Sequence, residues 1–366
     1  MSRIEVRYLL TLGAGERAEE KAERIAFEQT LEMAPGVVES ELELAIAGQV
    51  GAIEQIDDHR AVATVSYPED LASDISQLLN LLFGNVSLYA GVRVQGVLWP
   101  EGLLERLHGP RHGMAGLREL CGVHQVRPML CAVSKPVGRS ASELATLCGE
   151  LAEGGVDVVK DDHSLADQPS APFHDRVQRC SDAVREVDGD TLYFPGVTGT
   201  PAQLAFRCEE VAASGCRGVV LCPFAVGLGA VRELAQSTDL AIIAHPAMSG
   251  MFFHEQSGIA PELLLGELLP MIGCDAVIFP HAPGKFSLTP EACQKICLRA
   301  RESRGGSRPA MPAPGGSLAI ESLPDWMSIY GPDSMFIVGS GLQTGPDIRA
   351  QAAAMMGLLE DSFAID

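Results

Sequence analysis

The 366-residue sequence lacks the features of exported, membrane-spanning and nucleic-acid-binding proteins. No stretch is apolar for long enough to span a bilayer, and the opening MSRIEVRYLL has no apolar core like that of a signal peptide. Basic residues are scarce: 27 Lys plus Arg against 48 Asp plus Glu give a formal charge of -21. This balance argues against nucleic acid or an anionic membrane as a partner, although backbone amides could still hold a phosphorylated ligand.

The ten cysteines include no CxxC pair, which removes the usual signature of a structural zinc site or a redox motif. Without an export signal, reduced thiols are the expected state, and we expect a cytoplasmic protein. Hydrophobic residues make up 46% of the chain, so the sequence should fold into one large or two smaller domains.

Residues 1–125 are expected to form an α+β domain of the ferredoxin-like kind. Apolar alternation predicts a strand at 5–12, two more at 41–48 and 60–68, and another at 91–100. Amphipathic patterns predict helices at 16–33 and 70–84. This order favours an antiparallel sheet with helices on one face.

Residues 126–366 have a different pattern of apolar and polar residues. Eight short apolar runs recur, and helical stretches with their own start signals separate most of them. Ser140 and Glu143 have the spacing of a capping box, and Thr200-Pro201 and Thr289-Pro290 each suggest a cap followed by proline. Eight strands alternating with helices predict a (β/α)8 TIM barrel. The alternative is an open doubly wound sheet, but no GxGxxG follows the first strand.

Polar residues and glycines are concentrated where the predicted barrel strands end, which is where barrel enzymes carry their active sites. These strand ends contain Lys135, the run Lys160-Asp161-Asp162-His163, Thr198, His245, His281, Gly315-Gly316 and Gly339-Ser340-Gly341.

The second strand end, GGVDVVKDDH, carries four consecutive ionisable side chains, at residues 160–163. Strand alternation places Lys160 and Asp162 on one face and Asp161 on the other, with His163 at the point where the strand stops. Converging oxygen and nitrogen donors could ligate a divalent metal, or Lys160 and Asp162 could form an ion pair inside the barrel. Position alone leaves both interpretations open.

The other strand ends are also ambiguous by themselves. A lone histidine such as His245 is often structural, although its place at the predicted catalytic face favours a function. The glycines after strands seven and eight match the phosphate-binding corner of such barrels, where bare amides can approach an anion.

These motifs together resemble the RuBisCO family. GGVDVVKDDH is similar to the RuBisCO signature GGxDxxKDDE, and further matching motifs follow in the family's order: FGNV, SKPVG, AHPAMSG, a Gly-Lys pair, PGG and VGSG. The resemblance covers nearly the whole chain. It implies that Lys160 reacts with carbon dioxide to give a carbamate, which would hold Mg²⁺ with Asp162 and His163.

The same resemblance implies roles for the remaining residues. Lys135 would be the base or the phosphate-side lysine, and His245 would face the substrate. Glu28 and Asn85 would reach the barrel of a neighbouring subunit, making the active unit a homodimer or larger. The phosphate and substrate ligands would be Gly315, Gly316, Gly339, Ser340 and Lys285.

The departures from the carboxylase pattern are specific. His163 stands where carboxylases have glutamate, Pro246 replaces an arginine that binds one phosphate, and Ser249 replaces a histidine. The loop around Lys285 is shorter than the mobile loop of carboxylases, and SKPVG is one residue short of KPKxG. The chain is therefore identified as a RuBisCO-like protein that does not carboxylate.

A metal, a lysine and one phosphate corner suit enolisation of a phosphorylated ketopentose. SLADQ, at 164–168, is similar to the branch that isomerises 5-methylthioribulose 1-phosphate in methylthioadenosine salvage. Two related activities compete: a 2,3-diketo-5-methylthiopentyl-1-phosphate enolase, and an oxo-isoapionate-phosphate decarboxylase or isomerase. A catalytically silent binding or regulatory protein is the non-enzymatic alternative.

Overall fold

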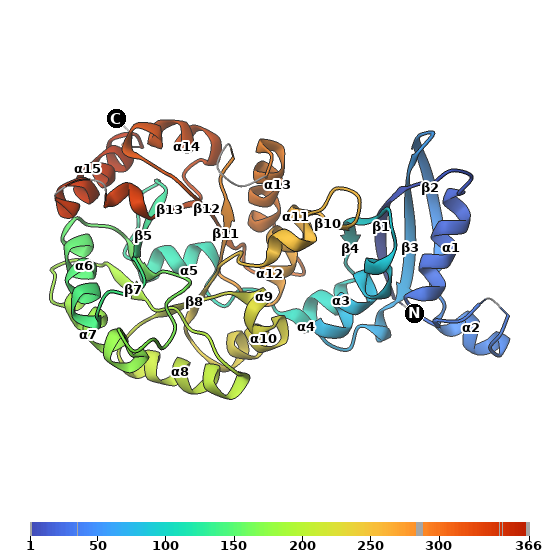
Figure 1. The fold of residues 1–366 in the computed structure, drawn as a ribbon, viewed down its shortest axis with the longest axis horizontal. Helices are drawn as coiled ribbons and strands as arrows, with labels where there is room; N and C mark the ends of the chain where they lie inside the picture. The colour runs from blue at the N-terminus through green and yellow to red at the C-terminus, as the bar shows by residue number, and fades with distance from the viewer. Residues whose placement is uncertain (1, 35, 283–287, 344, 346, 364–366) are drawn as a thin grey trace. The chain divides into compact units, whose positions relative to one another are not determined.

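The computed structural model describes residues 2–34, 36–282, 288–343, 345 and 347–363. The chain divides into two compact units, residues 1–108 with 248–264, and residues 109–247 with 265–366. The first unit contains a five-stranded sheet and the second an eight-stranded one (Figure 1). No helix in these described ranges is long and apolar enough to cross a membrane.

The sheet of the first unit has the order β10-β4-β1-β3-β2, in which β10 pairs in parallel and the other neighbours pair antiparallel. Helix α1 packs its buried face, including Ile25 and Ala26, against β2 and β3. The elements of this unit are β1 (Arg3–Thr11), α1 (Ala18–Glu28), α2 (Ser40–Ile46), β2 (Gln49–Asp57), β3 (Arg60–Pro68), η1 (Glu69–Leu71), α3 (Ile75–Phe83), η2 (Asn85–Leu88), β4 (Val92–Leu98), α4 (Glu101–Leu107), η3 (Ser249–Phe252), β10 (Gly258–Ile259) and α11 (Pro261–Leu263).

One expected strand of the first unit is wrong. The sequence predicts a strand at 41–48, where Leu42 and Leu44 alternate with glutamates and apolar residues follow, but 40–46 form the helix α2. None of the α2 residues is buried, so no sheet face selects the alternating pattern, and Glu, Leu and Ala all favour a helix. The strand itself comes directly afterwards, as β2.

All eight predicted strands of the second unit are present, and they close into a barrel. Their order is β7-β6-β5-β13-β12-β11-β9-β8, and a parallel bridge between Gly196 and Val220 joins the two ends. The strands are β5 (Met129–Ser134), β6 (Val158–Asp161), β7 (Leu192–Phe194), β8 (Gly218–Leu221), β9 (Ala241–Ala244), β11 (Ala276–Pro280), β12 (Met311–Gly315) and β13 (Met335–Val338).

Helices connect these strands, and the start signals in the sequence are confirmed. Ser140 and Thr200 each form a capping box, and the Thr289 side chain accepts a hydrogen bond from the Ala292 amide. The helices are α5 (Gly113–Leu120), α6 (Ala141–Glu153), α7 (Phe173–Arg185), α8 (Pro201–Ala213), α9 (Pro223–Val226), α10 (Leu228–Ser237), η4 (Leu264–Leu268), α12 (Leu269–Met271), α13 (Pro290–Arg301), η5 (Ile320–Ser322), α14 (Leu323–Tyr330), η6 (Ser340–Leu342) and α15 (Ile348–Asp361).

The boundary between the units differs from the predicted one at residue 125, because α5 belongs to the barrel. Leu117 of α5 and the following Cys121 are part of the barrel's hydrophobic core. The buried carboxylate of Asp275 also accepts hydrogen bonds from the amides of His112 and Gly113, each at 2.7 Å. The segment 248–264, which carries β10, in turn joins the sheet of the first unit.

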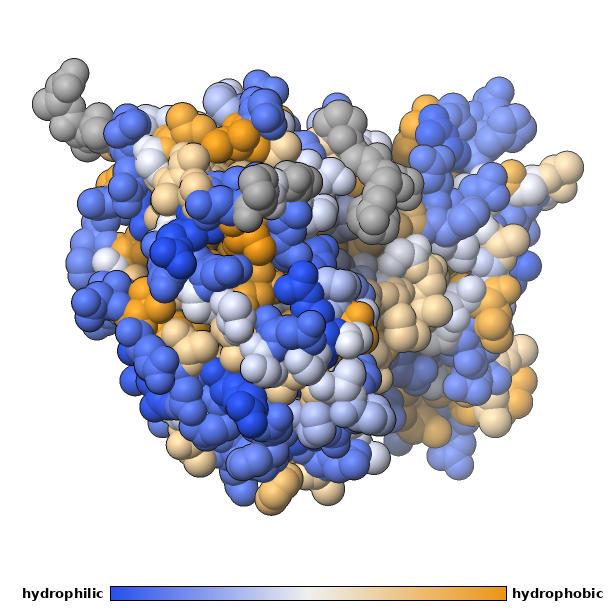
Figure 2. Space-filling view, turned by 60° about the vertical axis from the view of Figure 1, so that its left-hand side comes forward, coloured by the Kyte–Doolittle hydropathy of each residue, from blue (hydrophilic) through white to orange (hydrophobic). Residues whose placement is uncertain are grey.

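Figure 2 shows a face on which hydrophilic side chains predominate and hydrophobic side chains form only small groups. The apolar residues that the sequence does contain are largely inside, and alternate residues of the barrel strands fill the barrel interior.

Candidate active site

The candidate site residues follow the inward-facing core side chains of the barrel strands. The core contains Val133 of β5, Val158 of β6, Ile243 of β9, Ala313 of β12 and Ile337 of β13. Because successive strand side chains alternate between faces, residues two positions later continue along the interior toward the C-terminal mouth. Those residues are Lys135, Lys160, His245, Gly315 and Gly339.

Lys160 is almost completely buried, with 2% of its surface exposed. Its Nζ donates a hydrogen bond to the backbone carbonyl of Asp161 at 2.7 Å. Burial lowers the pKa of the Lys160 ammonium, which increases the fraction of neutral amine. A neutral amine is the form that reacts with carbon dioxide, so this environment suits carbamate formation.

Asp161 points away from the barrel interior, as the strand alternation predicts. Its carboxylate has no exposed surface and forms a buried ion pair with Arg176 of α7, Nε to Oδ2, at 3.0 Å. It also accepts hydrogen bonds from the Tyr193 hydroxyl at 2.8 Å, the Gly196 amide at 3.0 Å and the Ser134 hydroxyl at 3.2 Å. Asp161 therefore anchors the end of β6 and is not available as a ligand.

Asp162 and His163 lie together where β6 ends. His163 Nδ1 is 3.3 Å from Asp162 Oδ1, and that same oxygen accepts a hydrogen bond from the Ser164 amide at 3.0 Å. Burial lowers the pKa of His163, so its imidazole is neutral near pH 7 and keeps a lone pair for a ligand.

The rings of His163 and His245 stack face to face, with centroids 3.9 Å apart and planes within 7°. Burial, together with the charge of Lys160, lowers the pKa of His245 to about 2. The Ala247 amide donates to His245 Nδ1 at 3.2 Å, so the proton of this neutral ring resides on Nε2. In this neutral form His245 presents a hydrogen-bond donor, the Nε2–H group, at the barrel mouth.

Lys135 follows β5, and its side chain reaches the glycine-rich corner after the neighbouring strand β13. A methyl group in place of the Gly339 hydrogen would overlap Nζ of Lys135, so the lysine keeps this position only beside a glycine. Gly316 has a φ of +117°, a conformation that favours glycine, and Ser340 begins η6. The structure thus brings Lys135 next to Gly339, while Lys285 lies outside the described residues.

The residues present fit a divalent cation only if Lys160 is modified. Among the described residues, no group of three or more His, Cys, Asp and Glu could hold a metal ion. Asp162 and His163 could supply two donors, and Lys160 is the family's third ligand position, but an ammonium there would repel a cation. A carbamate replaces that positive charge with two carboxylate-like oxygens, which are ligands of the kind that Mg²⁺ prefers.

Cys222 is a further residue at this mouth that sequence reasoning missed. It follows Val220 by two positions, so strand alternation also directs it along the barrel interior. It is the one half-buried cysteine, whereas the other nine are buried. Burial raises the pKa of its thiol while the nearby positive charge of Lys160 lowers it. The same two-residue register that identifies Lys160 could have identified Cys222.

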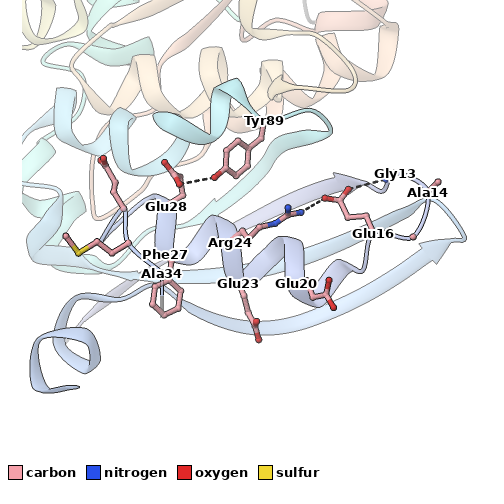
Figure 3. Close-up of a pocket in the computed structure, with 13 residues that line it drawn as sticks. Gly13, Ala14, Glu16, Glu20, Glu23, Arg24, Phe27, Glu28, Ala34 and Tyr89 are labelled. Atoms are coloured by element: carbon pink, nitrogen blue, oxygen red, sulfur yellow. Dashed lines mark hydrogen bonds and ion pairs between the residues drawn. The ribbon is translucent and has the colours of Figure 1, made fainter. Parts of the chain in front are cut away.

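Glu28 and Asn85 lie together in the first unit. Asn85 Nδ2 donates to Glu28 Oε1 at 3.0 Å, and the Tyr89 hydroxyl donates to Glu28 Oε2 at 2.9 Å. Glu28 and Tyr89 also line an open pocket of about 890 Å³ beside α1, where Figure 3 shows them facing each other. The predicted contribution of these residues to a neighbouring subunit stays a prediction.

Comparison with known proteins identifies the family. The model of the ribulose bisphosphate carboxylase large chain, catalytic domain, matches residues 113–286. The chain is 35% identical to ribulose bisphosphate carboxylase-like protein 1 of Rhodopseudomonas palustris, covering 96% of both chains. It is 33% identical to a 5-methylthioribulose-1-phosphate isomerase of Rhodospirillum rubrum, covering 92% of this chain and 90% of that one.

Further similarities extend to an enolase and to solved structures. A 2,3-diketo-5-methylthiopentyl-1-phosphate enolase of Microcystis aeruginosa is 31% identical, over 84% of this chain and 80% of that one. A Rubisco-like protein from Rhodopseudomonas palustris superimposes with a TM-score of 0.91 at 30% identity, covering 100% of this chain and 99% of that one. A dimeric archaeal Rubisco from Hyperthermus butylicus superimposes with a TM-score of 0.88 at 26% identity, covering 100% of this chain and 93% of that one. The chain therefore belongs to the ribulose bisphosphate carboxylase (RuBisCO) large-chain family, as one of its RuBisCO-like proteins.

Proposed function

We propose that this RuBisCO-like protein is an enzyme that enolises a phosphorylated ketopentose, and that it isomerises 5-methylthioribulose 1-phosphate. The observation that carries the proposal is one barrel mouth with a buried lysine, a carboxylate–imidazole pair and a second lysine beside a glycine corner. The similarity to the Rhodospirillum rubrum isomerase, which extends over most of both chains, supports the choice of substrate.

The metal site would consist of the Lys160 carbamate, Asp162 and His163. When bound there, a divalent cation such as Mg²⁺ polarises the substrate carbonyl and stabilises an enediolate. The carbamate forms when the Lys160 amine attacks carbon dioxide, creating a nitrogen–carbon bond and releasing one proton. The buried ion pair of Asp161 with Arg176 holds the strand that presents this group.

The phosphate would bind at Gly315, Gly316, Gly339 and Ser340, with the side chain of Lys135 beside Gly339. In a ketopentose 1-phosphate, C1 joins the phosphate ester to the C2 carbonyl. The other neighbour of the carbonyl, C3, carries a hydroxyl group, and removal of the C3 proton is the enolisation that leads toward the isomer. Lys135 would take that proton. The electron pair of the broken C3–H bond would form the C2–C3 double bond of the enediolate. Protonation at C2 would then move the carbonyl to C3, and a second shift of the same kind would move it to C4, so that the unmoved phosphate is on C5 of the renumbered product.

His245 would assist by donating its Nε2 proton in a hydrogen bond to a substrate oxygen on which charge develops. Such a donor stabilises the enediolate more than the ketone, because the negative charge is larger in the enediolate. The stacked His163 ring fixes the plane of His245, so the donor direction is set before substrate binds.

A subunit arrangement with shared sites completes the proposal. Glu28 and Asn85, held together by their hydrogen bond, would reach the barrel mouth of a second copy in a homodimer or larger assembly. The similarity to a Rubisco described as dimeric supports this arrangement.

Product analysis tests the proposed reaction. The protein is incubated with Mg²⁺, bicarbonate and 5-methylthioribulose 1-phosphate, and the mixture is followed by ¹H and ³¹P NMR. We expect a new pentulose phosphate of identical mass, with its phosphate on C5. A parallel incubation with 2,3-diketo-5-methylthiopentyl 1-phosphate tests the enolase activity that the name of the Microcystis relative suggests. Turnover of the diketone alone would make the protein an enolase, and no turnover of either would favour a silent binding protein.

A further inference from the structure

The donor chemistry at the end of β6 carries an inference about the kind of metal, which rests on the metal site of the proposed function. Asp162 Oδ1 and His163 Nδ1 are 3.3 Å apart. Ligand atoms bound at about 2.1 Å to one ion lie about 3.0 Å apart at octahedral angles and about 3.4 Å apart at tetrahedral angles. The two side chains therefore already have the spacing of neighbouring ligands on one cation.

The two donors differ in hardness. Mg²⁺ prefers carboxylates, carbonyls and water, whereas an imidazole nitrogen suits first-row transition metals. His163 also contributes no negative charge. A Lys160 carbamate and the Asp162 carboxylate would each carry one negative charge. Together they would neutralise the two positive charges of one divalent cation.

The His163 ring is held in place before any metal arrives. Its stacking on His245 at 3.9 Å limits rotation of the imidazole plane, and 40% of its side chain remains accessible. A fixed neutral ring loses little conformational entropy when it binds a metal, which favours metals that form strong bonds to imidazole nitrogen.

From this geometry we propose that His163 is a metal ligand and makes the site selective for a divalent first-row transition metal over Mg²⁺. Co²⁺ and Mg²⁺ are the matched probes, because they differ in affinity for nitrogen while sharing charge and octahedral coordination. The preference for Co²⁺ over Mg²⁺ should come from the imidazole and should disappear with it.

The experiment compares three proteins in bicarbonate buffer by isothermal titration calorimetry with CoCl₂ and with MgCl₂. They are the wild type, His163→Gln, which keeps the charge and offers an oxygen, and His163→Glu, which adds a charged oxygen. We expect the ratio of the Mg²⁺ Kd to the Co²⁺ Kd to fall at least tenfold in both variants. A ratio that stays within threefold of the wild type in both variants would overturn the inference.

Electron spin echo measurements on the Mn²⁺-loaded wild type provide a readout that needs no variant to fold. Coupling to an imidazole nitrogen is expected in the wild type and should be lost in His163→Gln, whose fold is checked by circular dichroism. Cation binding without nitrogen coupling would overturn the inference and leave the proposed metal site intact. No binding of any of the three cations would overturn both.

Discussion

The Nε atom of Arg176 donates to Oδ2 of Asp161 at 3.0 Å, and neither side chain has any exposed surface. Asp161 stands between Lys160 and Asp162, so this buried pair fixes the strand end that presents the candidate metal ligands. The Asp161 carboxylate also accepts hydrogen bonds from Tyr193, Gly196 and Ser134.

Replacing Arg176 by methionine should be strongly destabilising, because it leaves the Asp161 charge buried without its cation. We expect a loss of about 3–5 kcal/mol in the free energy of unfolding, measured by urea denaturation. Arg179→Met is the matched control on the same helix, since Arg179 pairs with Asp175 on the exposed surface and should cost at most about 0.5 kcal/mol. Similar losses in the two variants would contradict the anchoring role.

Replacing Gly339 by alanine should impair activity while leaving stability nearly unchanged. The added methyl group would overlap Nζ of Lys135, and the flexible lysine can move aside at little cost to folding. The displaced amine would no longer reach both phosphate and substrate, so we expect kcat/KM to fall at least tenfold. Gly357→Ala is the control, because no heavy atom lies within 4 Å of its new methyl group. Unchanged kinetics in Gly339→Ala would show that Lys135 does not act at this corner.

His245 should contribute through its Nε2 proton. His245→Ala removes the donor, and we expect kcat to fall on the order of a hundredfold, as for other lost donors to a developing anion. His245→Gln places an amide NH₂ near the position of Nε2 and should recover part of the loss. The two variants are compared by steady-state kinetics at saturating substrate. Equal rates for alanine and glutamine would argue against hydrogen-bond donation.

Glu16 provides a pH-dependent test of the first unit. Burial opposes its ionisation, but hydrogen bonds from the Gly13 amide and the Lys21 ammonium outweigh burial and hold the pKa of Glu16 below its ordinary value. A carboxyl group with a lowered folded-state pKa adds stability above its unfolded pKa, and this contribution is lost as pH falls through the folded value. Glu16→Gln should therefore cost on the order of 1 kcal/mol at pH 7.

The cost should shrink below about pH 4.5, the ordinary pKa of this carboxyl, because the unfolded wild-type chain then binds a proton before the folded protein does. Urea denaturation of both proteins at pH 7 and pH 3.5 measures the difference. The control is Glu19→Gln, whose pair with Arg17 is exposed on both sides. A cost that stays constant with pH would contradict the assigned role of Glu16.

The barrel, and the choice of which strand-end side chains face its interior, could be predicted because side-chain alternation depends only on neighbouring residues of one strand. Val158 and Lys160 share one face while Asp161 takes the other, and the structure confirms this order. Helix α2 was not predictable in the same way, since Leu42 and Leu44 alternate like a strand but pack against nothing that would select one. Arg176 was not predictable either, because its meeting with Asp161 depends on how α7 packs against the barrel.

The most direct test of enolisation at the Lys160 site is the incorporation of solvent deuterium into the substrate beside its carbonyl. Wild type and Lys160→Ala are each incubated in heavy water with bicarbonate, a divalent cation and 5-methylthioribulose 1-phosphate, and the carbon-bound protons are followed by ¹H NMR. We predict rapid exchange in the wild type and none above background in the variant, because alanine can form no carbamate. Equal exchange in the two proteins, or none in the wild type, would contradict the proposed mechanism.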